Sequence, residues 1–303
     1  MPPFDAIIIG GSFAGLSAAL QLARTARPVL VIDAGRPRNR FAAASHGFFT
    51  QDGNNPLAMI AAAREQLLCY PNARLIEGEV TEVAGGDGAF EVTTGAGDAF
   101  RARKLVLAYG VSDRLPDVPG LAERWGKTVL HCPYCHGYEF AGRRIAVLQS
   151  HPMASHQALL VADWGPTTLL VNGGTEPDAE TAAKLAARGI AIETAAVLGL
   201  RGEGEGLEAV LLADGRTLPV DALYVGPQPR SNSDLAERLG CAMDETPLGS
   251  IIRTDERKHT TVAGVFAAGD IARVPHNATW ASADGVAAGV FLHQSLVFEP
   301  LAA

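Results

Sequence analysis

The sequence predicts an α/β protein with two Rossmann-like, doubly wound domains of the dinucleotide-binding type, the first with an inserted antiparallel β meander. Residues 5–33 follow the order strand, glycine-rich loop, helix and strand, and their apolar, β-branched strands are typical of a buried parallel sheet. Residues 143–171 repeat the order strand, helix and strand, which indicates a second unit of the same kind. The length of 303 residues suits two domains of about 150 residues each.

The first domain begins with an apolar strand over 6–9 and a tight loop over 10–15. The alanine-rich stretch 16–26 has the composition of a helix. A strand over 28–32 follows, and Asp33 comes directly after it. The other elements expected in this domain are a helix over 56–70 and the three strands of the meander, over 74–83, 90–94 and 104–108.

Two turn-prone segments divide the chain. Residues 116–120, Pro-Asp-Val-Pro-Gly, form the first hinge, and residues 227–233 form the second. The chain then returns to the first domain through a strand that ends on Asp270 and a helix over 278–296. We therefore expect a discontinuous first domain over 1–115 and 248–303, and a central domain over 116–247 with a strand, a helix and a strand at 145–148, 155–163 and 167–171.

Charge and hydropathy exclude several classes of partner. The chain carries 25 basic and 33 acidic residues, a net charge of −8, which disfavours nucleic acid and anionic membranes. Its longest apolar stretches are far shorter than the roughly 18 residues that a membrane span needs. The N-terminus shows neither the basic nor the apolar region of a secretory signal, so we expect a cytoplasmic protein.

The loop Gly10-Gly-Ser-Phe-Ala-Gly15 matches the dinucleotide fingerprint at its first and last glycines. That fingerprint needs a tight turn, a close approach of the backbone to a pyrophosphate, and the N–H groups at a helix start. Ser12 replaces the middle glycine and is small enough for the close approach. Asp33 follows Gly15 by 18 residues, where a carboxylate binds the hydroxyls of an adenosine ribose.

The segment Ala267-Ala-Gly-Asp270 indicates which dinucleotide is bound. Small residues before an aspartate at a strand end let the backbone approach a ribityl-pyrophosphate chain, and the aspartate accepts a hydrogen bond from a ribityl hydroxyl. A Gly-Asp pair alone is a common turn. Together with the glycine loop at the other end of the chain, the segment favours FAD over NAD.

The motif His131-Cys-Pro-Tyr-Cys-His136 is the strongest chemical signal. Two cysteines separated by two residues close a small disulfide ring, and one thiol of such a pair often has a depressed pKa. A zinc site needs four ligands, and Cys69 and Cys241 are isolated, so we expect no metal and read these two as small buried residues. The spacing also fits c-type haem attachment, which needs an exported protein. A redox-active dithiol is favoured over these sites and over an inert structural pair.

Histidines lie close to each of these motifs. His131 and His136 flank the cysteine pair, where they would tune thiolates or act as acid and base. His46 lies in a glycine-rich loop and His276 follows the Asp270 loop, where the cofactor would pass. For each of the four, an ordinary surface or hydrogen-bonded histidine is the alternative.

The order of these motifs over nearly the whole chain resembles that of the low-molecular-weight thioredoxin reductase family. The resemblance implies two dinucleotide-binding domains, bound FAD and a homodimer. It also implies that Cys135 lies against the flavin and that Cys132 exchanges with the substrate. The cofactor contacts that it implies are Gly10, Ser12, Phe13, Ala14, Gly15, Asp33, Ala34, Arg40, His46, Val80, Ala108, Gly110, Gly269, Asp270, Asn277 and Ala278.

The chain departs from that family at the second dinucleotide loop. Where an NADPH loop would show Gly-x-Gly-x-x-Ala, residues 149–154 are Gln-Ser-His-Pro-Met-Ala. Gln149 and His151 replace the two glycines, and no arginine that would bind a 2′-phosphate follows strand 167–171. We therefore expect no ordinary NADPH site. In addition, His136 stands where the reductases have an aspartate as general acid.

A branch of the same superfamily shares these departures: the FAD-dependent dithiol oxidases that close disulfides in small natural products such as gliotoxin and holomycin. Segments 45–48, 132–139 and 275–277 are similar to that branch. The resemblance implies that electrons pass from a dithiol through Cys132 and Cys135 to FAD, and on to O₂ or another acceptor.

The substrate that this resemblance implies is a small-molecule dithiol or disulfide, or a thioredoxin-like protein. His136, His131 or His276 would carry the protons. Two alternatives stay open: an NAD(P)H-dependent thioredoxin-disulfide reductase with an atypical nucleotide loop, and a flavin-bound thiol redox sensor with little turnover.

Overall fold

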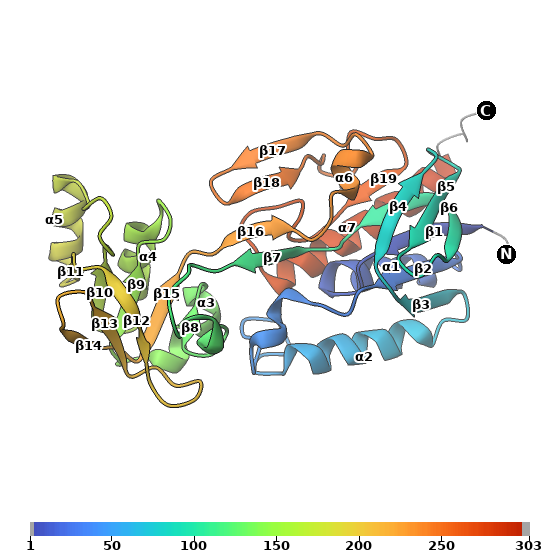
Figure 1. Cartoon of the computed structure of the whole chain (residues 1–303). Helices are drawn as coiled ribbons and strands as arrows, with labels where there is room; N and C mark the ends of the chain where they lie inside the picture. Colours follow the sequence, from blue (N-terminus) through green and yellow to red (C-terminus); the bar gives the residue numbers. More distant parts are fainter. Residues whose placement is uncertain (1–2, 299–303) are drawn as a thin grey trace. The chain divides into compact units, whose positions relative to one another are not determined.

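A computed structural model describes residues 3–298 of the chain (Figure 1). These residues form two compact units, each with its own main sheet. Unit 1 contains residues 3–40, 56–112 and 229–298, and unit 2 contains residues 41–55 and 113–228.

The boundaries of the units lie near the hinges predicted at 116–120 and 227–233. Strands β7 (Val111–Arg114) and β16 (Gln228–Ser231) carry the chain across these boundaries and pair with each other. Residues 1–2 and 299–303 of the expected first domain lie outside the described part of the chain.

The loop 41–55 belongs to unit 2, whereas the sequence places it in the first domain. An antiparallel bridge between Ser45 and Asn54 closes this loop on itself. The loop also packs tightly on unit 2, because a Cβ added to Gly126 would lie 2.8 Å from the Cβ of Phe41. Contacts over such a separation in sequence cannot be inferred from local composition.

The sheet of unit 1 has seven strands and is centred on β6 (Ala99–Leu107). One edge of β6 pairs in parallel with β1 (Phe4–Ile9). Along the other edge, the first half of β6 pairs antiparallel with β5 (Phe90–Thr94), and the second half pairs in parallel with β19 (Val265–Ala267). A single strand therefore belongs both to the nucleotide-binding sheet and to the meander.

The strands β2 (Val29–Asp33) and β3 (Ala73–Glu77) extend the parallel part of this sheet, and β4 (Val80–Ala84) completes the antiparallel meander. The inserted meander is thus confirmed. The single strand predicted over 74–83 is wrong, because the chain leaves the parallel sheet at Gly78 and continues as a separate, antiparallel strand.

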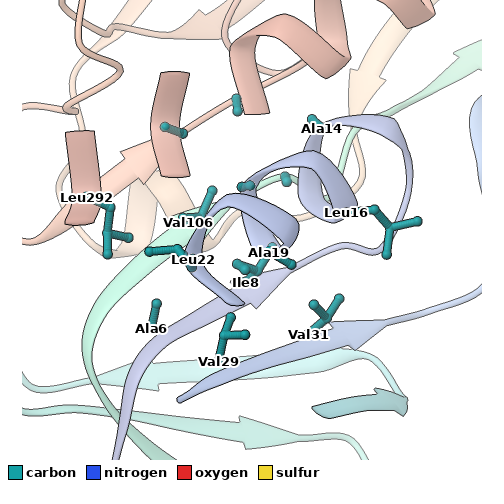
Figure 2. Close-up of a cluster of buried hydrophobic side chains, with 14 of the residues drawn as sticks. Ala6, Ile8, Ala14, Leu16, Ala19, Leu22, Val29, Val31, Val106 and Leu292 are labelled. Carbon is teal, nitrogen blue, oxygen red and sulfur yellow. The ribbon is translucent and has the colours of Figure 1, made fainter. Parts of the chain in front are cut away.

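Helices α1 (Phe13–Arg24) and α7 (Ala278–Phe298) pack closely against each other in unit 1, and α2 (Pro56–Leu68) contacts α1. Small residues permit the close packing, since a Cβ on Gly289 would lie 2.7 Å from the carbonyl oxygen of Ala18. Figure 2 shows the apolar cluster at this contact, which includes Ala14, Leu16, Ala19 and Leu22 of α1, Ile8, Val31 and Val106 of the sheet, and Leu292 of α7.

Helix α6 (Leu235–Arg238) and the hairpin of β17 (Met243–Thr246) and β18 (Gly249–Ile252) also belong to unit 1. Their buried side chains join the apolar core on one face of the main sheet. Unit 1 therefore resumes at residue 229, before the position 248 that the sequence analysis expects.

The main sheet of unit 2 is parallel throughout. Alternate residues of its strand β9 (Ile145–Leu148) belong to two different apolar clusters, one on each face. Because the main sheet of each unit is buried on both faces, the expected doubly wound folds are confirmed. The strand order is β11 (Ala191–Glu193), β10 (Thr167–Leu170), β9, β15 (Ala222–Val225) and β8 (Val129–Leu130).

Unit 2 also contains an antiparallel sheet of β12, β13 and β14, which is not predicted from the sequence.

None of the helices in residues 3–298 is long and apolar enough to span a membrane. The remaining elements of unit 2 are β12 (Val197–Arg201), β13 (Ala209–Leu212), β14 (Thr217–Pro219), α3 (Pro133–His136), α4 (Ala154–Val161), α5 (Ala179–Ala187), η2 (Ala122–Arg124) and η3 (Tyr138–Phe140), while η1 (Arg38–Phe41) joins the units.

Candidate functional site

The glycine loop of unit 1 joins β1 to α1. Gly10 has a φ of +110°, and a Cβ at this position would overlap with the carbonyl group of Ala108. A Cβ at Gly15 would likewise overlap with the carbonyl oxygen of Gly10. Ser12 precedes α1 in extended conformation, and its side chain does not cap the helix. The loop thus leads the backbone tightly into the positive end of a helix dipole, which suits an anionic pyrophosphate.

Asp33 is buried at the end of β2 and lies directly beside this loop. One carboxylate oxygen accepts a hydrogen bond from the N–H of Gly11 at 2.9 Å, and the other forms an ion pair with Arg64 of α2. A Cβ at Gly11 would lie 2.7 Å from the Cβ of Asp33. The carboxylate is therefore fixed beside the glycine loop, and its predicted contact with an adenosine ribose stays a prediction. Arg64 is a contact that the sequence analysis does not identify.

The loop after β19 brings Asp270 and His276 together through a third residue, Arg38. The Arg38 Nη1 atom lies 3.0 Å from a carboxylate oxygen of Asp270 and 2.6 Å from Nδ1 of His276. Because a guanidinium only donates, Nδ1 of His276 is the acceptor, and the neutral ring carries its proton on Nε2. Arg40, the residue predicted from the sequence in this segment, donates from its guanidinium to the carbonyl of Pro37.

The other predicted cofactor residues occupy several places. In unit 1, Gly269 lies against α1, since an added Cβ would be 2.9 Å from the Cβ of Ala14. Asn277 accepts a hydrogen bond from the N–H of Thr279 at the start of α7. Val80 is buried in the core of the meander. His46 lies in unit 2, where it contacts Glu139 and His136. Phe13, Ala14, Ala34, Ala108, Gly110 and Ala278 flank the loops of unit 1.

These residues of unit 1 fit FAD. Three glycine positions exclude side chains from the turn, a fixed carboxylate follows the second strand, and the Asp270 loop lies against the start of the same helix. The loop geometry suits the pyrophosphate, and the two carboxylates suit the ribose and the ribityl chain.

The dithiol lies in unit 2 at the start of the short helix α3. Cys132 and Cys135 form a disulfide, with their Cα atoms 5.3 Å apart. Sγ of Cys132 caps α3 by accepting the N–H of Cys135 at 3.2 Å, and Pro133 occupies the first helical position. An amide that donates to sulfur stabilises negative charge there, so a Cys132 thiolate is favoured. Groups of three or more metal-ligating side chains are not found among residues 3–298.

Aromatic side chains support the dithiol helix. A Cβ on Gly137, directly after α3, would lie 2.6 Å from the indole ring of Trp164, and the Tyr134 ring meets this indole edge-on at 6.1 Å. His131 stacks on Trp125 with their ring centroids 5.7 Å apart. Sequence reasoning does not identify Trp125 or Trp164, because neither belongs to a motif.

His136 faces a polar cluster within unit 2. The ring of His46 meets it edge-on at 6.3 Å, and Nε2 of His46 lies 3.3 Å from a carboxylate oxygen of Glu139. Burial lowers the pKa of His136, and His46 lowers it further, while Glu139 raises it. The neutral form of His136 is therefore favoured at pH 7 and can accept a proton.

A cavity of about 370 Å³ adjoins this cluster in unit 2. Its volume lies in the range of small-molecule sites. The residues that line it are Ala43, Ala44, His46, Gly126, Lys127, Thr128, His136, Glu139, Phe140, Glu205 and Gly206.

The second dinucleotide loop, between β9 and α4, is filled by its own side chains. The His151 ring lies against Gly226 so closely that a Cβ there would overlap with it, and Nδ1 of His151 accepts the N–H of Met153 at 3.2 Å. Ser150 bonds both the N–H and the carbonyl oxygen of Gly226 at 3.1 Å. The His151 ring and the Ser150 hydroxyl thus lie beside Gly226, and the N–H of Met153 already has an acceptor within the protein.

The two remaining cysteines differ in exposure. Cys241 is buried as expected, and burial raises the pKa of its thiol. Cys69 is exposed, so its predicted burial is wrong. It lies just beyond the C-terminal end of α2, where the helical pattern does not distinguish a core position from a surface one.

The chain is similar in sequence and in structure to known proteins over nearly its whole length. A model of the pyridine nucleotide-disulphide oxidoreductase family matches residues 4–285. The thioredoxin reductase tcpT of Claviceps purpurea is 34% identical over 299 residues, with 94% of this chain and 92% of that protein covered. The thioredoxin reductase sirT of Leptosphaeria maculans is 33% identical over 305 residues, with the same coverage. The crystal structure of an oxidoreductase from Agrobacterium tumefaciens is 48% identical, with a TM-score of 0.94 over 98% of this chain and 100% of that one.

Proposed function

Because the chain belongs to the pyridine nucleotide-disulphide oxidoreductase family, whose thioredoxin reductase-like members are FAD-dependent enzymes that act on sulfur groups, we propose that it is a dithiol oxidase. The observation that carries the proposal is the pairing of an intact dithiol with a second dinucleotide loop that His151 fills. A chain that keeps the cysteine pair but obstructs the nicotinamide nucleotide site takes its electrons from a dithiol.

The reaction follows the ordinary course of thiol–disulfide exchange. A thiolate of the substrate attacks Sγ of Cys132, the bond to Cys135 breaks, and Cys135 leaves as a thiolate. The second substrate thiolate then attacks the substrate sulfur bound to Cys132. The product leaves as a disulfide and Cys132 leaves as a thiolate, which the N–H of Cys135 stabilises.

Electrons and protons balance over the cycle. The substrate loses two electrons and two protons, and the electrons first reside in the reduced cysteine pair. Bound FAD would supply a two-electron acceptor for this dithiol, and the final acceptor would be O₂, with H₂O₂ as the product, or another acceptor. The FAD would be held by the glycine loop, Asp33 and Asp270 of unit 1.

His136 is the proposed base for the substrate thiol. It follows Cys135 directly, and the lowered pKa of its imidazole keeps the ring neutral at pH 7. His46 and Glu139 complete the cluster around it. His131 stacks on Trp125 and His276 is bonded to Arg38, so these two are less suited to the same role.

Several finer statements belong to the same proposal. The substrate is a small-molecule dithiol, which the cavity beside His136 has the volume to hold, rather than a thioredoxin-like protein. The enzyme is a homodimer, as its resemblance to the thioredoxin reductases implies, and it acts in the cytoplasm. Size-exclusion chromatography with light scattering tests the dimer, and a monomer of the holoenzyme would contradict it.

The function is tested by measuring O₂ uptake and H₂O₂ formation with small dithiols and no nicotinamide nucleotide. We expect steady turnover with one H₂O₂ formed for each disulfide. In the matched assay, NADPH with a disulfide or oxidised thioredoxin should give no reduction. NADPH-driven disulfide reduction would establish the reductase alternative instead, and inactivity in both assays would favour the redox sensor.

A further inference from the structure

The connection between β12 and β13 lines the cavity beside His136, and the proposed reaction gives it no part. The connection spans residues 202–208, and Glu205 and Gly206 within it form part of the cavity wall. The antiparallel sheet of unit 2 thus contributes a charged side chain to the place where the dithiol is proposed to bind.

Hydrogen bonds hold the backbone of this connection in place. The guanidinium of Arg124, a residue only 7% exposed, donates to the carbonyl oxygens of Gly202 at 2.8 Å and Gly206 at 2.9 Å. The hydroxyl of Thr128 donates to the carbonyl oxygen of Glu205 at 2.6 Å. The turn is also tight, because a Cβ at Gly202 would lie 2.1 Å from the carbonyl oxygen of Gly206. Glu205 is therefore presented to the cavity from a fixed backbone.

The cavity wall carries more acidic than basic side chains. Besides two histidines, the charged residues that line it within residues 3–298 are Lys127, Glu139 and Glu205. Nζ of Lys127 lies 3.5 Å from a carboxylate oxygen of Glu205. Glu139 lies 3.3 Å from Nε2 of His46, and this contact is an ion pair only while the imidazole is protonated. With neutral histidines, two carboxylates therefore stand against one ammonium group, and the wall is negatively charged.

Exposure to solvent sets the strength of these charges. The side chain of Glu205 is 65% exposed, that of Glu139 38% and that of Lys127 32%. Charges exposed to this extent interact across water, so each changes a binding or rate constant by a few fold, and salt screens the effect. The loss of a single charge from the wall should therefore be small but measurable.

We propose that this cavity selects uncharged dithiols over anionic ones, and that Glu205 is a specificity-determining residue. The inference rests on the proposed function, because it takes the cavity as the place where the dithiol binds. A carboxylate on the substrate would be repelled by Glu205 and Glu139, while the attraction of Lys127 is already directed at Glu205. An uncharged dithiol meets no such repulsion and leaves the ion pair of Lys127 and Glu205 intact.

Dihydrolipoamide and dihydrolipoate test the inference, because they differ only in an amide or a carboxylate at a distance from the two thiols. Each reduces the disulfide of Cys132 and Cys135 in the holoenzyme to the dithiol and itself becomes a cyclic disulfide, so that two electrons and two protons are transferred. The reaction is run under argon at about pH 8, where imidazoles are ordinarily neutral. Electron uptake is followed by alkylation of the two cysteines and mass spectrometry, together with the loss of flavin absorbance.

The measured quantity is the rate constant with dihydrolipoamide divided by the rate constant with dihydrolipoate. The same quotient for bis(2-hydroxyethyl) disulfide, a small uncharged disulfide in solution, gives the intrinsic difference between the two reagents. The first quotient divided by the second is the charge selectivity, for which we expect about 2–5 in the wild-type protein at low salt. About 1 M KCl should bring the charge selectivity close to unity.

Variants assign the charge selectivity to single side chains. Glu205→Gln should lower it by about 2- to 5-fold, and Lys127→Gln should raise it by a similar factor, because each removes one charge from the wall. Glu203→Gln is the matched control, since Glu203 is an exposed glutamate of the same connection and does not line the cavity. This control should change the charge selectivity by less than about 1.5-fold.

The outcomes distinguish this inference from the proposed function. A wild-type charge selectivity at or below unity would overturn the inference, and so would an equal effect of Glu203→Gln and Glu205→Gln. If the charge selectivity depends on Glu205 in a protein that shows no O₂ uptake with dithiols, the inference stands and the dithiol oxidase fails. If O₂ uptake is steady and the charge selectivity is absent, the proposed function stands and the inference fails.

Discussion

Replacing Gly137 with alanine tests the contact that holds the dithiol helix. Gly137 has helical backbone angles of φ −71° and ψ −38°, so alanine causes no strain there and by itself would stabilise the folded state by about 0.5–1 kcal/mol. The added Cβ, however, would lie 2.6 Å from both the Pro133 carbonyl oxygen and the Trp164 ring. Overpacking of this kind costs about 1–3 kcal/mol. The free energy of unfolding of unit 2 should therefore fall by about 1–2 kcal/mol.

Urea unfolding followed by tryptophan fluorescence measures this change, because Trp125 and Trp164 both lie in unit 2. The midpoint should fall by about 0.5–1 M for a denaturant slope of about 2 kcal/mol/M. Gly86→Ala is the control, since no atom lies within 4 Å of an added Cβ, and it should change stability by less than about 0.5 kcal/mol. The penalty should shrink in a Trp164→Leu background. An alanine at 137 that leaves the midpoint unchanged in wild-type background would refute the contact.

Three further predictions concern the chemistry. Cys132→Ser and Cys135→Ser should each abolish dithiol turnover with the FAD content of the purified protein unchanged, and residual turnover above 1% of wild type, taken as a rough limit, would contradict exchange through the pair. Asp270→Ala should weaken FAD binding by about 1–3 kcal/mol, because a hydrogen-bond acceptor is lost and Arg38 loses its ion pair. The dissociation constant of FAD measures this change, and an unchanged dissociation constant would exclude Asp270 from the site. The pKa of His136 lies below its usual value of 6.5, and the rate with dithiols at low substrate concentration should fall as the pH drops through this pKa, because protonation removes the base. His136→Gln should lose this part of the pH profile.

Much of the fold follows from local patterns in the chain. The β1–α1–β2 unit is predictable because its apolar strands and glycine loop have a strict order, and the same holds for the strands β9 and β10. The antiparallel strands β12–β14 are not, because short, partly exposed strands are stabilised by pairing with each other rather than by a strong sequence preference. The position of loop 41–55 in unit 2 likewise depends on contacts distant in sequence.

The candidate site divides in the same way. Glycines that exclude a side chain and cysteines at a fixed spacing can be recognised in the sequence itself, so the tight turn at Gly10 and the disulfide are predictable. Arg38 and Arg64 cannot be recognised in this way, because an arginine acquires its role only from the residues that the fold places beside it.

The most direct test of the proposed function is the reduction of the bound flavin under argon, followed by its visible absorbance. The His151 ring lies against Gly226 beside the loop between β9 and α4, and its Nδ1 accepts the N–H of Met153, whereas Cys132 and Cys135 form a disulfide. Titration with dithiothreitol should therefore bleach the flavin stoichiometrically, and NADPH or NADH should reduce it at a negligible rate. Rapid stoichiometric bleaching by either nicotinamide nucleotide would contradict the dithiol oxidase and identify the chain as an NAD(P)H-dependent disulfide reductase.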